Sequence, residues 1–376
     1  MRKNILILGH DYTTQFVDIF NQYTRLFDKE KYAVTVAYLT GEPSEEIKER
    51  TLAENVLFLN FSKSAIRNLK INAIKTLLAL TRELSFHIVI CHRYKPTYIM
   101  MWVARFCNIP VLISVMHELR TMTSFKRKCL LALLIRKNTL FAGVSNAVRD
   151  DLRKSLWFLP KDRIVTLYNV IDVELTEPQL LDRKTARLAL DLSEENIIFG
   201  NLGRLVKNKD QASLIKAFAE IKPNCPLAKL IIIGSGVLES SLKQLTISLQ
   251  LSNDVIFTGF LTTGYRYMKA FDCFVLSSTQ EAFGRVLLEA MLAKLPIIAT
   301  KVNGIPEVMG KVGALTEPKN IAELAKNMQH IYALSQQDRK TLGDEAYHHA
   351  LHSFSIPTFH QTFWEMISSQ GFNHLR

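Results

Sequence analysis

Hydrophobic positions in this chain form short apolar runs that alternate with longer segments of helical spacing. Residues 4–9 (Asn-Ile-Leu-Ile-Leu-Gly) and 87–91 are such runs and predict buried strands. Segments such as 16–27 and 146–156 repeat apolar residues every three or four positions, as helices do when one face packs on a core. Strands alternating with helices predict a parallel sheet covered by helices on both faces.

This alternation occurs twice, with an aperiodic segment at 168–181 between the two sets. In the first set we predict strands at 4–9, 32–39, 56–59, 87–91, 111–116, 139–144 and 164–167, and helices at 16–27, 64–84, 97–106, 125–136 and 146–156. In the second set we predict strands at 197–200, 229–233, 255–258, 273–276 and 296–299, and helices at 211–221, 238–249, 285–294, 320–333, 338–351 and 358–368. The fold class is therefore α/β, with two doubly wound domains in tandem.

Length and composition agree with a folded two-domain protein. A chain of 376 residues is long for one core. The scattered cysteines lack metal-binding spacing and indicate free thiols in a reducing compartment. No apolar run approaches the roughly 18 residues that span a bilayer, and the start is too short for a signal peptide. We therefore expect a cytoplasmic protein.

The positive charge is concentrated in one part of the chain. Residues 61–170 hold 19 Lys or Arg against 5 Asp or Glu, a net charge of +14, whereas the whole chain carries +12. Such a region suits nucleic acid, an anionic membrane surface or an anionic substrate.

The most informative stretch is Ser278–Met291, which joins the predicted strand 273–276 to a predicted helix. Glu281 falls in the loop, and Glu289 falls on the helix among apolar neighbours. Ligands of open α/β sheets bind outside the carboxyl ends of the strands, and a helix that begins there favours an anion. The two carboxylates could face one polar, phosphate-bearing ligand. The alternative is a surface-loop Glu and a solvated helix Glu.

Two further loops follow predicted strands of the second set. Gly203–Asp210 contains Arg204 and Lys209, which could bind phosphate as a fork and as a point charge. Gly234–Gly236 (Gly-Ser-Gly) precedes a helix. A solvated basic loop and a simple tight turn are the alternatives for these two segments.

In the first set, His117 and Glu118 stand where the strand 111–116 ends, and His10 follows the first strand. A lone histidine is more often structural, but these positions lie at the crevice end of the sheet. Ser145 is better read as a helix N-cap than as a nucleophile.

Several kinds of site are disfavoured by the sequence. It contains no P-loop motif, no Asp-x-Asp triplet and no His/Cys cluster of metal-binding spacing. We therefore expect no metal and no cofactor.

These segments in this order resemble the family 4 retaining glycosyltransferases of GT-B fold. The resemblance also rests on Val144–Val148, Asn169–Asp172, Phe257–Gly259 and Pro296–Glu307. It implies an acceptor domain at 1–172, completed by a helix at about 355–376 that crosses back, and a donor domain at 183–352, with a cleft between the two. It also implies a UDP- or GDP-linked sugar as donor.

The resemblance implies specific roles for individual residues. His117 and Glu281 would be catalytic, facing the transferred sugar, while His10 and Glu118 would be weaker first-domain contacts. The donor-binding residues would be Gly203, Arg204, Lys209, Phe283, Gly284, Arg285, Val286, Leu287 and Glu289.

Three positions depart from the family pattern. The first loop, Gly9–Tyr12, lacks the usual Gly-Gly pair. Asp210 replaces a Gly after the loop lysine, and Asn303 stands where a Gly is common. Asn tolerates a left-handed backbone, so the last departure is mild.

The basic segment Ser124–Lys137 has cationic ends and an apolar middle. It predicts peripheral binding to the anionic inner face of the cytoplasmic membrane, where a glycolipid or oligosaccharide acceptor such as lipopolysaccharide core would be reached. Core helices with solvated ends are the structural alternative. A transferase acting on a soluble sugar and a sugar-nucleotide epimerase are functional alternatives. A basic nucleic-acid-binding protein is a more remote alternative. Nucleic acid is not an expected partner, because no recognised module accompanies the charge.

Overall fold

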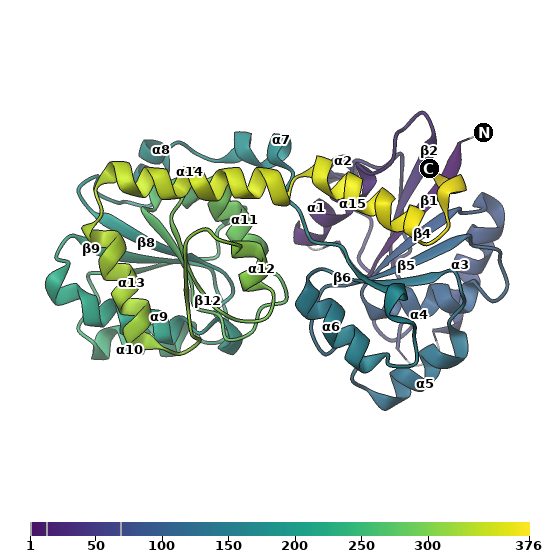
Figure 1. Ribbon diagram of the computed structural model, residues 1–376, viewed down its shortest axis with the longest axis horizontal. Coiled ribbons are helices and arrows are strands. Elements are labelled where there is room, and N and C mark those ends of the chain that lie inside the picture. The colour runs from purple at the N-terminus through teal and green to yellow at the C-terminus, as the bar shows by residue number, and fades with distance from the viewer. Residues whose placement is uncertain (1, 13, 68–69) are drawn as a thin grey trace. The chain divides into compact units, whose positions relative to one another are not determined.

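Two parallel β-sheets organise the chain, one in each of two units (Figure 1). The computed structural model describes residues 2–12, 14–67 and 70–376. Unit 1 comprises Met1–Asn169 and Ile356–Arg376, and unit 2 comprises Val170–Ser355. The two parallel Rossmann-like sheets confirm the predicted α/β fold class.

Unit 1 holds a seven-stranded sheet in the order β3-β2-β1-β4-β5-β6-β7 within the described residues. Its strands are β1 (Lys3–Gly9), β2 (Tyr32–Tyr38), β3 (Asn55–Phe58), β4 (Ile88–His92), β5 (Val111–Met116), β6 (Thr139–Gly143) and β7 (Ile164–Thr166). Its helices are α1 (Thr14–Thr24), α2 (Glu45–Arg50), α3 (Ile71–Leu84), α4 (Tyr94–Val103), α5 (Phe125–Leu134), α6 (Asn146–Ser155) and α15 (Ile356–Ser369).

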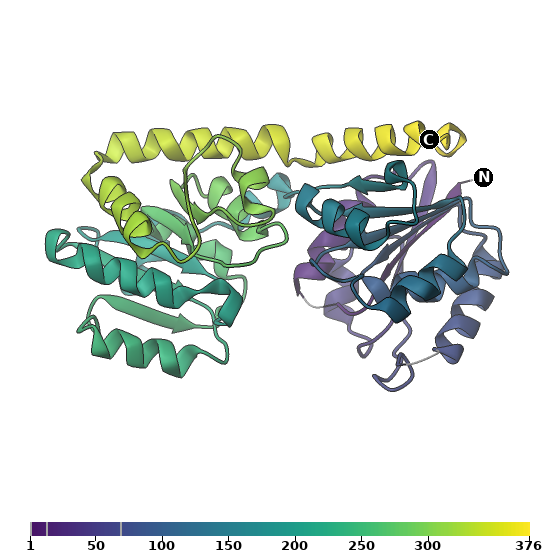
Figure 2. The same ribbon diagram turned by 60° about the horizontal axis from the view of Figure 1, so that its bottom comes forward.

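Unit 2 holds a six-stranded sheet in the order β10-β9-β8-β11-β12-β13. Its strands are β8 (Ile197–Leu202), β9 (Ala228–Ile233), β10 (Val255–Gly259), β11 (Cys273–Leu276), β12 (Ile297–Thr300) and β13 (Ala314–Thr316). Its helices are α7 (Val173–Thr176), α8 (Arg183–Ala189), α9 (Gln211–Ile221), α10 (Glu239–Ser248), α11 (Arg285–Leu292), α12 (Ile305–Met309), α13 (Ile321–Ala333) and α14 (Gln336–Ser353). Helices α9, α10 and α13 gather on one side of this sheet, and α11 and α14 lie together (Figures 1 and 2).

Each sheet has one topological switch point, where the connections that leave two neighbouring strands run in opposite directions. In unit 1 it lies between β1 and β4, and in unit 2 between β8 and β11. A crevice opens at such a point outside the carboxyl ends of the strands, and ligands of this fold class bind there.

Most predicted elements are confirmed, and the main errors concern where helices begin. The predicted helix 64–84 begins only at Ile71, and residues 68–69 of it lie outside the described residues. Ser62 forms a local turn instead, because its hydroxyl accepts a hydrogen bond from the backbone N–H of Ala65 at 3.2 Å. The predicted helix 97–106 is shifted toward the N-terminus, as α4. Helices α2, α7, α8 and α12 and the short β13 were not predicted.

Residues 170–182 and 353–355 pack with unit 2, beyond the range 183–352 expected for the second domain. The N–H of Ile171 donates to the carbonyl of Phe354 at 2.9 Å, and the N–H of Leu181 donates to Arg266 at 2.9 Å. The segment expected as a linker, 168–181, is therefore hydrogen-bonded to unit 2 over part of its length.

Helix α15 completes unit 1 through aromatic contacts with α1 and the loop after it. Phe359 meets Tyr23 edge to face at 5.0 Å between ring centroids, and Phe363 meets Phe27 at 5.8 Å. The indole of Trp364 donates to the carbonyl of Leu26 at 3.3 Å. The two chain ends consequently lie side by side (Figures 1 and 2), and Lys3 donates to the carbonyl of His374 at 2.7 Å.

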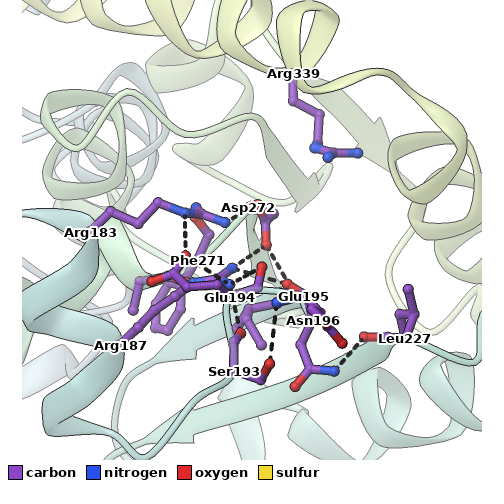
Figure 3. Close-up of polar contacts among 12 residues, drawn as sticks. Arg183, Arg187, Ser193, Glu194, Glu195, Asn196, Leu227, Phe271, Asp272 and Arg339 are labelled. Atoms are coloured by element: carbon purple, nitrogen blue, oxygen red, sulfur yellow. Dashed lines mark hydrogen bonds and ion pairs between the residues drawn. The ribbon is translucent and has the colours of Figure 1, made fainter.

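A buried arginine fixes the amino ends of the two central strands of unit 2 (Figure 3). The Arg187 side chain is 1% exposed, and its five N–H bonds match five acceptors. The acceptors are the carbonyls of Ser193, Glu194, Asn196 and Ala270 and the carboxylate of Asp272. Asp272 also accepts from the backbone N–H of Ile198 at 2.8 Å, which joins β11 to β8.

We expect Arg187→Leu to lower the free energy of unfolding of unit 2 by about 3–5 kcal/mol, because it removes the buried cation that pairs with Asp272 and leaves several buried carbonyls without their donor. Urea denaturation followed by circular dichroism measures the change. Arg183→Leu is a matched control, because Arg183 binds the same carboxylate from a position that is 39% exposed. Its loss is expected to stay below about 1 kcal/mol. Equal losses in the two variants would contradict the assigned role of Arg187.

Candidate functional site

The unit 2 crevice is bounded by the loops that follow β8 and β11. Lys209, from the first loop, forms an ion pair with Glu281, from the second. The two side chains are 16% and 17% exposed. The hydroxyl of Ser278 also donates to the Glu281 carboxylate, at 3.4 Å. A cation and a carboxylate, both mostly shielded from water, therefore meet at the switch point.

Backbone bonds hold these two loops in a fixed relation. The N–H of Thr279 donates to the carbonyl of Asn208 at 2.8 Å, and the amide of Asn208 donates to Gln280 at 3.2 Å. The hydroxyl of Ser277 donates to the carbonyl of Lys209 at 3.0 Å. Lys209 and Glu281 are thus positioned by their own backbones as well as by their attraction.

Asp210 and Asn303, which stand where the family commonly has glycine, both adopt the left-handed backbone conformation that glycine favours. Asp210 has φ 49°, and its carboxylate accepts a hydrogen bond from the hydroxyl of Ser213 at 2.8 Å. Asn303 has φ 43°, and its side-chain oxygen accepts from the N–H of Glu281 at 3.2 Å. Asp and Asn visit this region more readily than most residues, because their short polar side chains bond locally. The two departures therefore preserve the turns.

The Gly-Ser-Gly segment after β9 supports the Arg204 loop by close backbone contact. A Cβ added at Gly234 would lie 2.0 Å from the carbonyl oxygen of Gly203, and one at Gly236 would lie 2.4 Å from that of Leu205. The N–H of Leu205 donates to the carbonyl of Ser235 at 3.0 Å. This segment keeps the loop close to β9, and Arg204 itself is exposed.

Helix α11 begins at the same crevice. Its N-cap, Gly284, has φ 92°, a conformation that favours glycine. The N–H of Leu287 belongs to the turn that was expected to bind phosphate. It already donates to the carbonyl of Gly284 at 2.9 Å. Phe283 is buried with its ring 5.7 Å from that of Phe354, and Glu289 is half-buried on the helix.

In unit 1 the predicted His117 is hydrogen-bonded to a second histidine. Nε2 of His117 lies 2.9 Å from Nδ1 of His92, the last residue of β4. The His92 side chain is fully buried, and the pKa of His92 is lowered well below its usual value by burial, by His117 and by Arg93. The neutral form of His92 is therefore stable at neutral pH.

His10 follows β1 at the unit 1 switch point, and Arg93 follows β4 there. The Arg93 guanidinium lies 4.0 Å from the Phe16 ring centroid and 3.8 Å from the Asp11 carboxylate. Burial, with the nearby charges of Lys95 and Arg93 and against that of Asp11, lowers the pKa of His10. Glu118, in contrast, is exposed.

Five basic residues of unit 1 form what we name the cation cluster: Arg67, Lys70, Arg93, Lys95 and Arg127. Lys70 lies over the Tyr98 ring at 4.3 Å, and Arg127 lies over the Tyr94 ring at 4.4 Å. Burial, Lys95 and Arg127 lower the pKa of Lys70, and burial and Arg67 lower that of Lys95. These cations repel one another, so an anion placed among them would relieve that repulsion.

Helix α5 exposes an apolar face beside part of this charge. Phe125 is 78% exposed and Leu133 is 69% exposed, and a shallow groove runs along Phe125, Lys126, Cys129, Leu130 and Leu133. Exposed apolar patches rimmed by charge mark surfaces that bind partners or membranes.

In the described parts of the chain, no group of three or more His, Cys, Asp or Glu side chains is arranged to hold a metal ion. Among the same residues, no helix has the length and apolar character needed to cross a membrane.

Comparison with known proteins identifies the family. The family model described as glycosyl transferases group 1 matches residues 182–349, and the model of glycosyltransferase family 4 matches residues 21–175. The chain belongs to glycosyltransferase family 4. The resemblance inferred from its motifs is therefore confirmed.

A curated relative of this glycosyltransferase family member is the N-acetylgalactosamine-N,N'-diacetylbacillosaminyl-diphospho-undecaprenol 4-alpha-N-acetylgalactosaminyltransferase of Campylobacter jejuni. It is 30% identical over 236 residues, which are 60% of this chain and 61% of the relative. The chain thus spans about three fifths of that relative's length, and 43% and 55% of two others.

Solved structures share the fold over nearly the whole chain. A glycosyltransferase from Rickettsia africae has a TM-score of 0.84 at 17% identity and covers 99% of both chains. Anabaena Alr3699/HepE, solved in complex with UDP, has a TM-score of 0.79 at 22% identity and covers 98% of this chain and 100% of its own.

Several residues that flank the candidate site of this family 4 glycosyltransferase were not predicted from the sequence. His92, Arg93 and Lys95 follow one another across the end of β4 and the start of α4. The sequence feature that could have indicated them is a cluster of polar residues directly after a wholly apolar run. The pairing of His92 with His117 has no signature in sequence, because 25 residues separate them.

We expect Lys209→Met and Glu281→Gln each to lower the free energy of unfolding of the glycosyltransferase by about 1–3 kcal/mol, because each leaves a partly buried charge without its partner. The double variant should lose less than both losses combined, with a coupling energy of about 0.5–3 kcal/mol. Urea titration of the four proteins measures it. The exposed pair Lys243–Glu239 is the control, with an expected coupling of about 0.3–0.5 kcal/mol. Equal coupling in both pairs would contradict a special role for the crevice pair.

Proposed function

We propose that the chain is a retaining, metal-independent glycosyltransferase that moves a sugar from a nucleoside-diphosphate sugar to a membrane-associated glycolipid or envelope polysaccharide precursor. Family membership supports glycosyl transfer in general. The observation that carries the donor half is the ion pair of Lys209 and Glu281 at the unit 2 switch point, where α11 also begins.

The leaving group of this reaction is a nucleoside diphosphate, whose negative charge grows as the glycosidic bond breaks. Arg204 and Lys209 would stabilise that charge, as would the N-terminal turn of α11, whose dipole favours anions. The protein would then supply the positive field that a metal ion supplies in other enzymes. UDP, named in the complex of the Anabaena protein, is the first nucleotide to test.

Glu281 and Glu289 would hold different ends of the donor. Glu289, on α11, would accept hydrogen bonds from the ribose hydroxyls, while Glu281 would face the sugar. Because Glu281 already binds Lys209, a diphosphate that approaches Lys209 would also set the position of the Glu281 carboxylate. Binding of the donor and placement of its sugar would thus be coupled through one ion pair.

The acceptor half of the proposal rests on unit 1. The cation cluster offers positive charge at the switch point, and α5 offers an exposed apolar face with basic residues beside it. Both features suit an acceptor that carries phosphate and resides in an anionic membrane. The name of the Campylobacter relative, which includes diphospho-undecaprenol, agrees with such an acceptor. The protein would act at the cytoplasmic face of the membrane, bound peripherally.

We expect Arg204→Ala to lower kcat by roughly two to three orders of magnitude, as when one donor of an oxyanion hole is lost. A thermal-shift screen of sugar nucleotides first selects the donor, and release of the nucleoside diphosphate then measures turnover. Lys207→Ala is the matched control, because Lys207 is an exposed cation of the same loop. It should keep kcat within a few-fold of the wild type.

Near-normal turnover of Arg204→Ala would contradict the assigned donor site. An inverted anomeric configuration in the product, read by NMR, would contradict the retaining mechanism and leave the donor site intact.

We expect replacement of Lys126, Lys128 and Lys137 by Ser to weaken binding to anionic vesicles about 100-fold. Each cation near such a surface contributes about 1 kcal/mol, and 1.4 kcal/mol is tenfold. Co-sedimentation with phosphatidylglycerol-containing vesicles measures the partition.

The control for this experiment replaces Lys311, Lys326 and Lys340, three exposed lysines of unit 2, by Ser. This triple variant has the same net charge and should bind as the wild type does. If both triple variants lose binding equally, a specific membrane-binding face on α5 is excluded.

A further inference from the structure

The His92–His117 pair of unit 1 shares a single proton along a well-directed bond. The two nitrogens are 2.9 Å apart, the ring centroids are 5.2 Å apart and the ring planes differ by 25°. The centroid separation exceeds the nitrogen separation by roughly two ring radii, so the rings meet edge to edge. The bond therefore follows the ring plane, where the N–H bond and the lone pair of an imidazole point.

His92 cannot gain a charge at neutral pH without cost to this arrangement. His92 is fully buried, between the rings of Phe20 at 4.8 Å and Tyr23 at 4.7 Å. Burial raises the pKa of Tyr23, so its phenol is neutral as well. The charged groups nearby are Arg93 and its partner Asp11, and the Arg93 charge disfavours a second cation on His92.

With His92 neutral, the bond can run in either direction, and the two directions differ in what happens at Nε2 of His92. That atom is buried and has no hydrogen-bond partner among the described residues. If His117 donated, the proton of His92 would reside on Nε2 as a buried N–H without an acceptor. If His92 donates from Nδ1, its Nε2 carries only a lone pair. Buried N–H groups without acceptors are rarer than under-satisfied acceptors in proteins.

We infer that His92 is a positioning residue that donates its Nδ1–H to Nε2 of His117 and thereby fixes His117 as the tautomer with its proton on Nδ1. In many sites, the hydrogen bond made by one ring nitrogen of a histidine decides whether the other ring nitrogen carries the proton. Nδ1 of His117 then carries an N–H, which can donate a hydrogen bond but cannot accept one.

This inference deepens the proposed function and rests on it for its chemical meaning. A neutral imidazole whose remaining nitrogen bears a proton can donate a hydrogen bond to a hydroxyl or phosphate oxygen, but it cannot accept a proton there. His117 would therefore act as a hydrogen-bond donor to a substrate oxygen, and the general base of the reaction would be a different group.

The tautomer can be measured without any substrate. In protein labelled with ¹⁵N-histidine, we expect His117 to show a protonated Nδ1 and an unprotonated Nε2 at pH 7.5, and the bonded Nδ1 of His92 to be protonated. Replacement of each residue in turn assigns the signals. His330→Asn, a substitution at an exposed position of unit 2, should change no shift of the pair.

Two variants separate hydrogen bonding from packing. His92→Phe keeps a ring but removes the donor, so both His117 nitrogens should move toward the average of the two tautomers. His92→Asn keeps an N–H donor at the Nδ1 position and should restore the wild-type pattern. A protonated Nε2 on His117 of the wild type, or an unchanged pattern in His92→Phe, would overturn the inference. If His92→Phe does not fold, the wild-type and His92→Asn shifts still decide.

Turnover tests the functional meaning separately. With the donor found by thermal shift, kcat of His92→Phe should fall on the order of 10- to 100-fold, as for other partners that orient a functional histidine. KM for the donor should be unchanged, and His92→Asn should recover most of kcat. If His117 shows the expected tautomer but the protein transfers no sugar, the proposed function is contradicted and the inference about the tautomer stands. Equal turnover of His92→Phe and wild type would overturn the positioning role.

Discussion

The switch point between β8 and β11 is the constraint on which the rest of unit 2 depends. Because these neighbouring strands lead their connections in opposite directions, the loops that follow them diverge and leave a crevice at the carboxyl ends. At the opposite ends of the same strands, Arg187 and Asp272 bind the backbone of both. The strand pair is thus fixed at one end by a buried ion pair and open at the other end for a ligand. Lys209 and Glu281 meet across that opening.

Unit 1 repeats this plan with a different distribution of charge. Its switch point, between β1 and β4, is bordered by His10 and Arg93, with the cation cluster nearby. In unit 2 the crevice cation is balanced by a carboxylate, whereas in unit 1 the cations mostly face one another. The same topology therefore borders a balanced ion pair in one unit and a surplus of cations in the other.

Hydrophobic periodicity predicted the strands well because each buried strand of a parallel sheet is a continuous apolar run. It predicted the start of α3 poorly, because the hydroxyl of Ser62 competes for the backbone in a segment of otherwise helical spacing. The loops of the unit 2 site were recognisable as motifs, since glycine, arginine and lysine stand there at characteristic spacing. The His92–His117 bond and the Lys209–Glu281 pair could not be read in the same way. They depend on which strands become neighbours, and that is decided by the packing of the whole sheet.

Helix α15 makes the order of synthesis matter for folding. Unit 1 receives its last element, including Phe359 and Phe363, only after all of unit 2 has been made. Until then, Tyr23 and Phe27 lack the contacts with Phe359 and Phe363 that cover them in the finished protein. A nascent chain would therefore hold a partly open first unit while the second one folds, and apolar surface would be exposed to chaperones during that interval. Removal of residues 356–376 would make this transient state permanent, so a shortened chain would be prone to aggregation although its second unit is intact.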